Sequence, residues 1–138
     1  MQEQLPPSGS VLVWNKTFEM MVNKQLAERE PQYQEFITGV QDRIVDLIEP
    51  FGGKTAVYVH PGFLGRTTIK LVLPTLVPEL SYKDLEIQEG GTASDTWNRI
   101  ALGEYSEEEK VKKTKALLEY CKLDTLAMVK IWEVLKNI

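Results

Sequence analysis

The feature that most constrains this chain is one aspartate within an apolar segment near its C-terminal end. Asp124 interrupts the stretch LLEYCKLDTLAMV, residues 117–129. When residues 119–137 are wound as a helix at about 100° per residue, Asp124 falls nearly opposite the charged side chains, with Tyr120 one turn earlier on the same side. A buried carboxylate without a partner costs more free energy than a small domain can lose. The fold must therefore supply Asp124 with a partner.

Two kinds of partner fit this position. If a helix begins at Leu123, the carboxylate of Asp124 would bond the free backbone amides of its first turn and complement the helix dipole. Alternatively, Asp124 would hold a metal ion in a cleft, with the phenol of Tyr120 beside it. The pattern Tyr-x-x-x-Asp does not by itself decide between capping and metal binding.

Size and composition predict one ordinary globular domain over residues 1–138. The chain is 43% hydrophobic and 26% charged, and it has no apolar run near the roughly 18 residues that would cross a membrane. The N-terminal MQEQLPPSGSV lacks the features of a secretion signal. Cys121 is the only cysteine and cannot form an internal disulfide, so we expect a cytoplasmic protein. A net charge of −4 weakens the case for a pure nucleic-acid-binding module but is compatible with a nuclease, whose carboxylates hold cations.

Apolar periodicity and capping residues predict a mixed α/β chain with a helix-rich C-terminal half. Ser106 and Glu109 form a capping box that begins a long helix, and Asp46 suits either a helix cap or a cleft. The other expected elements, in order, are strand 10–14, helix 15–30 capped by Asn15, helix 33–42, strand 43–51, a short helix within 67–76 that stops near Pro74, an exposed extended segment 81–88 followed by a turn at 90–91, helix 94–103 and a last helix 123–136.

A second segment of the sequence bears on the metal-binding interpretation of Asp124. In VLVWNKTFE, residues 11–19, an apolar strand leads into a helix that opens with Asn15, Phe18 and Glu19. α/β sheets commonly bind ligands where strand ends face a helix N-terminus. A glutamate in a first turn also simply complements the helix dipole, and both interpretations of Glu19 remain open at this point.

Together, WNKTFE and YCKLD resemble two motifs of the DEDD superfamily of 3′–5′ exonucleases, in its DEDDy branch, which has the ribonuclease H-like fold. Asn15, Phe18 and Glu19 match the second motif of that superfamily, and Tyr120 and Asp124 match the third. The segment LEYCKLDTLAMVKIWEVL and the Y-x-x-L-x-I-x-x-G run from Tyr82 resemble most an uncharacterised bacterial family within it. The similarity extends over nearly the whole chain.

The resemblance implies a role for each matched residue. Asp124 and Glu19 would hold metal, Tyr120 would orient the attacking water, and Asn15 and Phe18 would contact the nucleic-acid substrate, DNA or RNA. Hard oxygen ligands select Mg²⁺ or Mn²⁺, and two such ions would hydrolyse the phosphodiester bond.

Two departures define what we expect of this chain alone. The opening Asp-x-Glu motif of the superfamily should precede Asn15 but does not, while Asp84-x-Glu86 comes too late and is not assigned to the site. Glu19 replaces the usual aspartate. We therefore expect an N-terminally incomplete ribonuclease H-like domain from a larger protein, inactive by itself, with a small sheet whose unpaired edge favours a homodimer. The alternative is a non-catalytic structural or protein-interaction domain that retains the fold.

Overall fold

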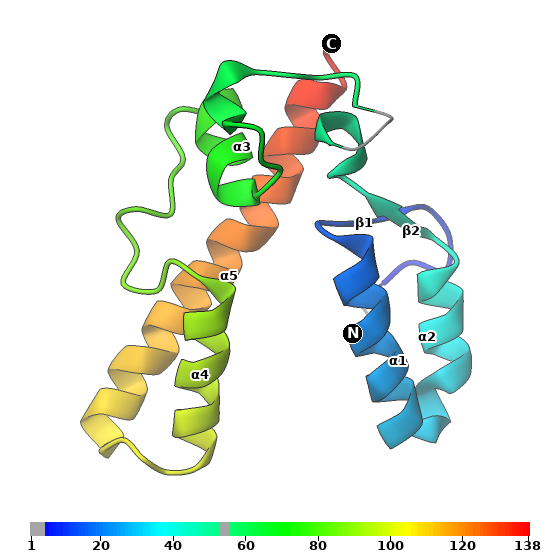
Figure 1. The fold of residues 1–138 in the computed structure, drawn as a ribbon. Helices are drawn as coiled ribbons and strands as arrows, with labels where there is room; N and C mark the ends of the chain where they lie inside the picture. Colours follow the sequence, from blue (N-terminus) through cyan, green and yellow to red (C-terminus); the bar gives the residue numbers. More distant parts are fainter. Residues whose placement is uncertain (1–4, 53–55) are drawn as a thin grey trace. The chain divides into compact units, whose positions relative to one another are not determined.

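The computed structural model describes residues 5–52 and 56–138. The chain divides into two compact units, Met1–Thr67 and Thr68–Ile138. Within the described residues there are five α-helices and one small parallel sheet, and the helix-rich C-terminal half agrees with the predicted mixed α/β class (Figure 1). The expectation that residues 1–138 form one domain stays a prediction, as does the ribonuclease H-like fold.

The first unit is built on a strand, two helices and a second strand. Strand β1 (Val11–Val13) leads into α1 (Lys16–Arg29), a single 3₁₀ turn η1 (Pro31–Tyr33) and α2 (Gln34–Gln41), and the chain returns in β2 (Ile44–Asp46). The two strands are parallel, with Val13 opposite Asp46, and the two helices lie side by side (Figure 1). The predicted strand 10–14 and helices 15–30 and 33–42 are confirmed.

The second strand is shorter than the predicted range 43–51. After Asp46 the chain turns into a 3₁₀ helix, η2 (Glu49–Phe51). Pro50 has no amide hydrogen for a sheet ladder, and the Asp46 carboxylate accepts a bond from the amide of Ile48, so both residues turn the chain out of the sheet. Each strand of this two-stranded sheet has one neighbour within the described residues. Dimerisation through the other edge stays a prediction.

An aromatic cluster holds the last part of the first unit against the strand ends. Phe51 lies 5.9 Å from Trp14 and 5.6 Å from Phe63, measured between ring centroids. Tyr58 packs on both phenylalanines, and the indole Nε1–H of Trp14 donates to the carbonyl of Thr67 at 3.1 Å. These contacts and the hydrogen bonds from the amides of Val57 and Tyr58 to the carbonyl of Pro50 fix residues 56–67, including the 3₁₀ turn η4 (Pro61–Phe63).

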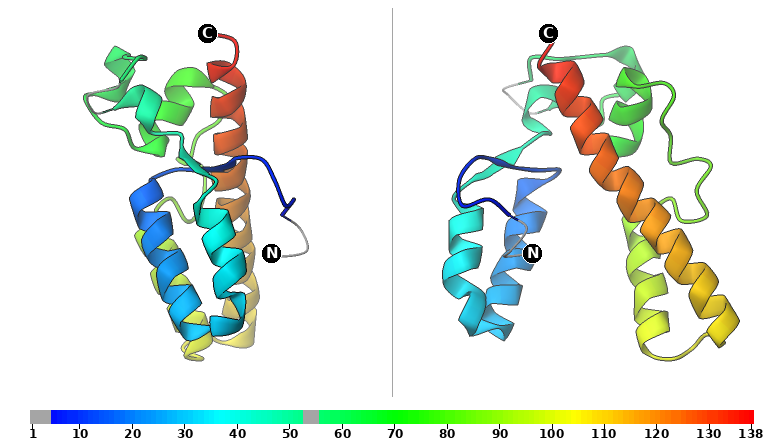
Figure 2. Two further views of the ribbon diagram at one scale, coloured as in Figure 1. Left: turned by 90° about the vertical axis from the view of Figure 1, so that its right-hand side faces the viewer. Right: turned by 180° about the vertical axis from the view of Figure 1, so that it is seen from behind.

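The second unit is organised by one long helix. Helix α5 (Glu107–Leu135) has 29 residues and packs against α3 (Ile69–Leu76) and α4 (Gly90–Ala101), as the views from opposite sides show (Figures 1 and 2). Its buried residues form one stripe, which consists of Ala116, Tyr120, Ala127 and Ile131. The predicted capping box is confirmed, because Ser106 and Glu109 bond each other's backbone amides.

Three predictions for the second unit are wrong in detail. The expected break before Leu123 does not occur, because the segment contains no glycine or proline and α5 continues through it. Helix α4 begins at Gly90 instead of Ser94, whereas α3 ends at Leu76, near Pro74 as predicted. The segment 81–88 is not an exposed extended chain, since Tyr82 and Ile87 are only 4% and 2% exposed. None of the described helices has the length and apolar content required to cross a membrane.

Asp46 joins the end of β2 to the start of α1. Its Oδ1 accepts hydrogen bonds from the amides of Asn15 (3.1 Å) and Ile48 (3.0 Å), and its Oδ2 accepts from the amide of Lys16 (2.7 Å). Asn15 adopts a left-handed conformation, φ 75°, which asparagine tolerates better than most residues, and its side chain accepts from the amide of Phe18. Of the two interpretations of Asp46, the structure shows the helix cap.

Replacing Asp46 with alanine should destabilise the first unit by about 2 kcal/mol, because three backbone amides lose a charged acceptor. Hydrogen exchange at the amides of Lys16 and Ile48, together with urea unfolding, measures the loss. Asp42→Ala is the matched control, since Asp42 is an exposed aspartate at the end of α2 and should change stability by less than about 0.5 kcal/mol. Equal stability of the two variants would contradict the capping role of Asp46.

Candidate site around Asp124

Asp124 lies in the middle of α5, so it does not cap a helix. The helix begins at Glu107, several turns before Asp124, and Ser106 is its N-cap. The amides near Asp124 are used in the i→i−4 bonds of a continuous helix and are not free to bond its carboxylate. Asp124 stands between Tyr120 and Ala127 on the buried stripe and is itself half-buried. Helix capping is thereby excluded as the explanation of this aspartate.

The partner of Asp124 is a tyrosine 42 residues earlier in the chain. The phenol of Tyr82 donates a hydrogen bond of 2.6 Å to Oδ1 of Asp124. A bond this short between a hydroxyl and a carboxylate is charge-assisted and stronger than one between neutral groups. Tyr82 belongs to the irregular segment between α3 and α4 and is 4% exposed. The half-buried carboxylate thus has a fixed side-chain donor.

Tyr120 forms the other side of this cluster. Its ring centroid lies 6.0 Å from that of Tyr82, and the residue is 8% exposed. A methyl group built on Gly90 would lie 3.6 Å from the Tyr120 hydroxyl, so this phenol reaches the first turn of α4. The spacing Tyr120–Asp124 places both side chains on one face of α5, as the sequence predicted.

Both phenols hold their protons more tightly than an ordinary tyrosine. Burial, the hydrogen bond to Asp124 and the negative charge of that carboxylate raise the pKa of Tyr82 well above its usual value. Burial and the charge of Asp124 raise the pKa of Tyr120 to about 12. At neutral pH both groups are therefore protonated, and they act as hydrogen-bond donors rather than bases.

The other predicted site residues lie in the first unit, at the start of α1. Asn15 is the N-cap, with its Oδ1 3.3 Å from the amide of Phe18, and the ring of Phe18 is 54% exposed. Glu19 is half-buried in the first turn. The structure thus groups Asn15, Phe18 and Glu19 in one helix start, and Tyr120 and Asp124 on one helix face. The assignment of these residues to a catalytic site stays a prediction.

Tyr82 is the one member of the cluster that sequence reasoning did not select. Its segment, SYKDLEIQ, is largely polar, which favoured an exposed extended chain. The available signal was the spacing of Tyr82, Leu85 and Ile87, three apolar side chains in a polar segment. Both Tyr82 and Ile87 prove to be buried anchors.

The described residues do not form a complete metal site. Within 5–52 and 56–138, no three His, Cys, Asp or Glu side chains come together in an arrangement that would hold an ion. The cluster in the second unit has one carboxylate, that of Asp124, and two protonated phenols. Hydrolysis with two metal ions requires further acidic ligands.

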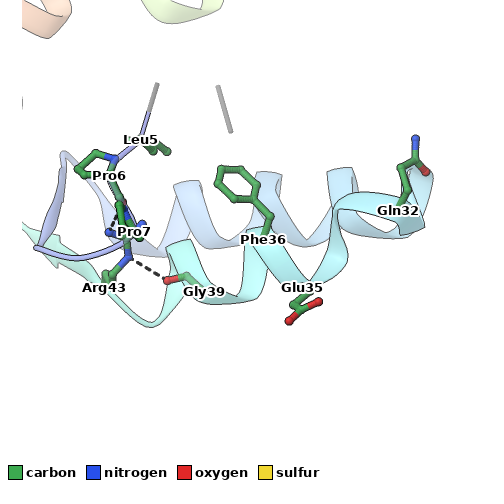
Figure 3. Close-up of a pocket in the computed structure, with 8 residues that line it drawn as sticks. All are labelled: Leu5, Pro6, Pro7, Gln32, Glu35, Phe36, Gly39 and Arg43. Carbon is green, nitrogen blue, oxygen red and sulfur yellow. Dashed lines mark hydrogen bonds between the residues drawn. The ribbon is translucent and has the colours of Figure 1, made fainter. Parts of the chain in front are cut away.

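A separate pocket of about 550 Å³ lies in the first unit, between residues 5–7 and α2 (Figure 3). Arg43 forms one of its walls and donates hydrogen bonds to the carbonyls of Pro6, Gly9 and Gly39. The lining residues include none of the predicted site residues. Through these hydrogen bonds, Arg43 holds the preceding segment against α2.

Residues 1–68 match the model of one protein family, which is described as a domain of unknown function (DUF2779). The match ends one residue beyond the end of the first unit, so it includes Asn15, Phe18 and Glu19 but not Tyr120 or Asp124. Neither a curated protein nor a solved structure matches the chain. The prediction of an uncharacterised domain family is supported for the first unit. Its membership of the DEDD exonuclease superfamily stays a prediction.

The cluster predicts a specific pH dependence of stability. A raised pKa in the folded chain contributes stability that is intact below the usual tyrosine pKa of about 10 and is lost as the pH rises through about 12. Asp124→Asn should move phenolate formation to lower pH, because it removes the negative charge but leaves the burial. Ultraviolet absorbance of the phenolate, recorded with circular dichroism across this range, measures both effects. An identical titration of wild type and variant would contradict the interaction.

Proposed function

We propose that this chain belongs to a metal-dependent 3′–5′ exonuclease domain with a ribonuclease H-like fold, which hydrolyses phosphodiester bonds in nucleic acid. The observation that carries this proposal is the position of Asp124, a half-buried carboxylate in the middle of a helix, beside Tyr120. The local alternative, a helix cap, is excluded by the continuous helix. A carboxylate and a tyrosine at this spacing are what the resemblance requires of the third motif.

The start of α1 supports the same proposal from the first unit. The Oδ1 of Asn15 accepts from the amide of Phe18, which leaves the amide N–H groups of its exposed side chain as donors for a phosphate oxygen. The exposed ring of Phe18 offers a surface on which a base can stack. Both features suit contact with a single strand of nucleic acid.

In the complete domain, Asp124 and Glu19 supply two of the four carboxylates used by the superfamily that the chain resembles. Mg²⁺ or Mn²⁺ bound there would activate water and stabilise the leaving oxygen. Tyr120 keeps its proton at neutral pH, so its role is to orient the attacking water by hydrogen bonding rather than to remove a proton. Residues 5–52 and 56–138 bring no group of three potential metal ligands together, so we expect this chain by itself to bind Mn²⁺ weakly and to cleave nothing.

A non-catalytic structural or protein-interaction domain is the second candidate. The hydrogen bond from Tyr82 gives Asp124 a partner without any cation, and the part of the chain that the structure describes contains no group of three potential metal ligands. In this alternative, the Tyr82–Asp124 bond only holds the segment between α3 and α4 on α5.

The two candidates differ in a nuclease assay on the protein encoded by the complete reading frame. The exonuclease proposal predicts that Mn²⁺ causes stepwise shortening of a 5′-labelled single strand from its 3′ end. Asp124→Asn should reduce the rate roughly 100-fold or more, because it removes a charged ligand. Denaturing gel electrophoresis of the labelled strand, DNA and RNA in parallel, measures the rate.

Asp84→Asn is the matched control, since Asp84 is an exposed aspartate of the same unit that is not assigned to the site. It should leave the rate unchanged. A folded wild-type protein that does not shorten either strand supports the non-catalytic candidate. An active protein in which Asp124→Asn retains the full rate excludes Asp124 as a ligand.

A further inference from the structure

Helix α5 carries two apolar stripes, and only one of them is buried within the described residues. The buried stripe lies on the side of the helix that packs against α3 and α4 (Figures 1 and 2). A second set of uncharged side chains follows at spacings of three, four or seven residues, about 140° further around the helix. We call it the outer stripe, which consists of Val111, Leu118, Cys121, Thr125, Met128 and Trp132. All of these residues except the half-buried Met128 are exposed.

The outer stripe has the pattern of a surface that packs against another helix. Four of its members, from Val111 to Trp132, recur every seven residues, as the contact residues between two helices do. Val111 and Leu118 are 71% and 66% exposed. The Thr125 hydroxyl donates to the carbonyl of Cys121 at 3.1 Å, which leaves its methyl group for apolar contact. An exposed apolar stripe of this length marks an interaction surface, and its repeat of seven residues favours a helix as the occupant.

The charges beside the outer stripe indicate the chemistry of that occupant. Lys115, Lys122 and Lys136 lie along one edge of the outer stripe, at spacings of seven and fourteen residues. Neither Lys115 nor Lys122 takes part in the ion pairs that the described residues form, so both charges are available to a partner. A helix with acidic side chains next to its apolar side complements this edge.

A second copy of the chain complements the outer stripe less well. In an antiparallel pair of α5 helices the two lysine edges would face each other, and the like charges would repel. In a parallel pair the lysines would face the opposite edge of the outer stripe, where Asp124 is already bonded by Tyr82. The charges therefore favour a different protein as the partner.

We infer that the outer stripe of α5 docks an acidic amphipathic helix of another protein. The apolar side of that helix covers the outer stripe, and its aspartate or glutamate side chains pair with Lys115, Lys122 and Lys136. No residue of the proposed exonuclease site belongs to the outer stripe, so this inference does not depend on nuclease activity.

Two synthetic peptides of three heptads test the inference on the full 138-residue chain. Both carry leucine at the two apolar positions of each heptad, and the flanking positions are glutamate in one peptide and lysine in the other. Fluorescence anisotropy of the labelled peptides measures binding. The acidic peptide should bind at least about 10-fold more tightly than the basic one at low salt, and the difference should shrink as salt screens the charges.

Two pairs of variants locate the binding surface. Leu118→Ser should weaken binding of the acidic peptide about 10-fold, because a leucine contact is lost. Leu102→Ser is its control, since Leu102 is a 74% exposed leucine at the end of α4. Lys122→Glu should weaken the same binding roughly 3-fold, whereas Lys112→Glu, at an exposed lysine on another side of α5, should leave it unchanged. All four residues are exposed, so circular dichroism should show the wild-type helix content in each variant.

The wild-type chain offers a test that needs no substitution. Cys121 is the only cysteine, it is exposed, and it lies within the outer stripe. With the acidic peptide at about ten times its Kd, alkylation of Cys121 by N-ethylmaleimide should slow about 10-fold. The basic peptide at the same concentration should leave the rate unchanged, and mass spectrometry measures both rates.

Each contrary outcome overturns the inference. Absence of binding by the acidic peptide up to about 1 mM, or binding that Leu118→Ser and Cys121 alkylation do not detect, would exclude the outer stripe as its docking surface. Equal binding of the two peptides would exclude an acidic partner. A dimer of the chain in light scattering that Leu118→Ser dissociates would show that a second copy covers the outer stripe instead.

Discussion

The second unit depends on the hydrogen bond between Tyr82 and Asp124. A carboxylate on the buried stripe of α5 would be strongly destabilising without a partner, and the phenol of Tyr82 provides one at 2.6 Å. The bond also determines the path of the segment between α3 and α4, because Tyr82 can reach Asp124 only if this segment lies against α5. Burial of Tyr82 and Ile87 follows from the same placement. This bond and the ion pair between Glu86 and Lys113 thus hold on α5 a segment that has no regular secondary structure.

A comparison of Asp124 with Asp46 shows why one of them is a candidate ligand and the other is not. Both oxygens of Asp46 are occupied, by three backbone amides at the junction of β2 and α1. A cation bound to Asp46 would have to displace bonds that form the start of a helix. Asp124 meets side-chain donors instead, the phenols of Tyr82 and Tyr120, and holds no helix start in place. A cation at Asp46 would therefore disturb the start of α1, whereas a cation at Asp124 would not displace backbone hydrogen bonds of a helix start.

Local signals in the sequence predicted those parts of the fold that local interactions stabilise. The strand 11–13, the cap at Asn15 and the capping box at Ser106 each depend on neighbouring residues, and all are present. The burial of Tyr82 depends on a contact between residues 42 positions apart, which periodicity cannot reveal. For the candidate site, the shared face of Tyr120 and Asp124 followed from helical spacing. The donor that completes the cluster did not, because its segment is too polar to indicate burial.

The number of carboxylates limits what the cluster can do by itself. A divalent ion attracts one carboxylate strongly, but two ions near each other repel and are held only by several negative charges. Asp124 with two protonated phenols supplies one such charge, so its cluster is stable without metal and would need further acids to serve as a two-metal centre. The hydrogen bond from Tyr82 gives Asp124 a partner within the protein and thereby removes the need for a cation.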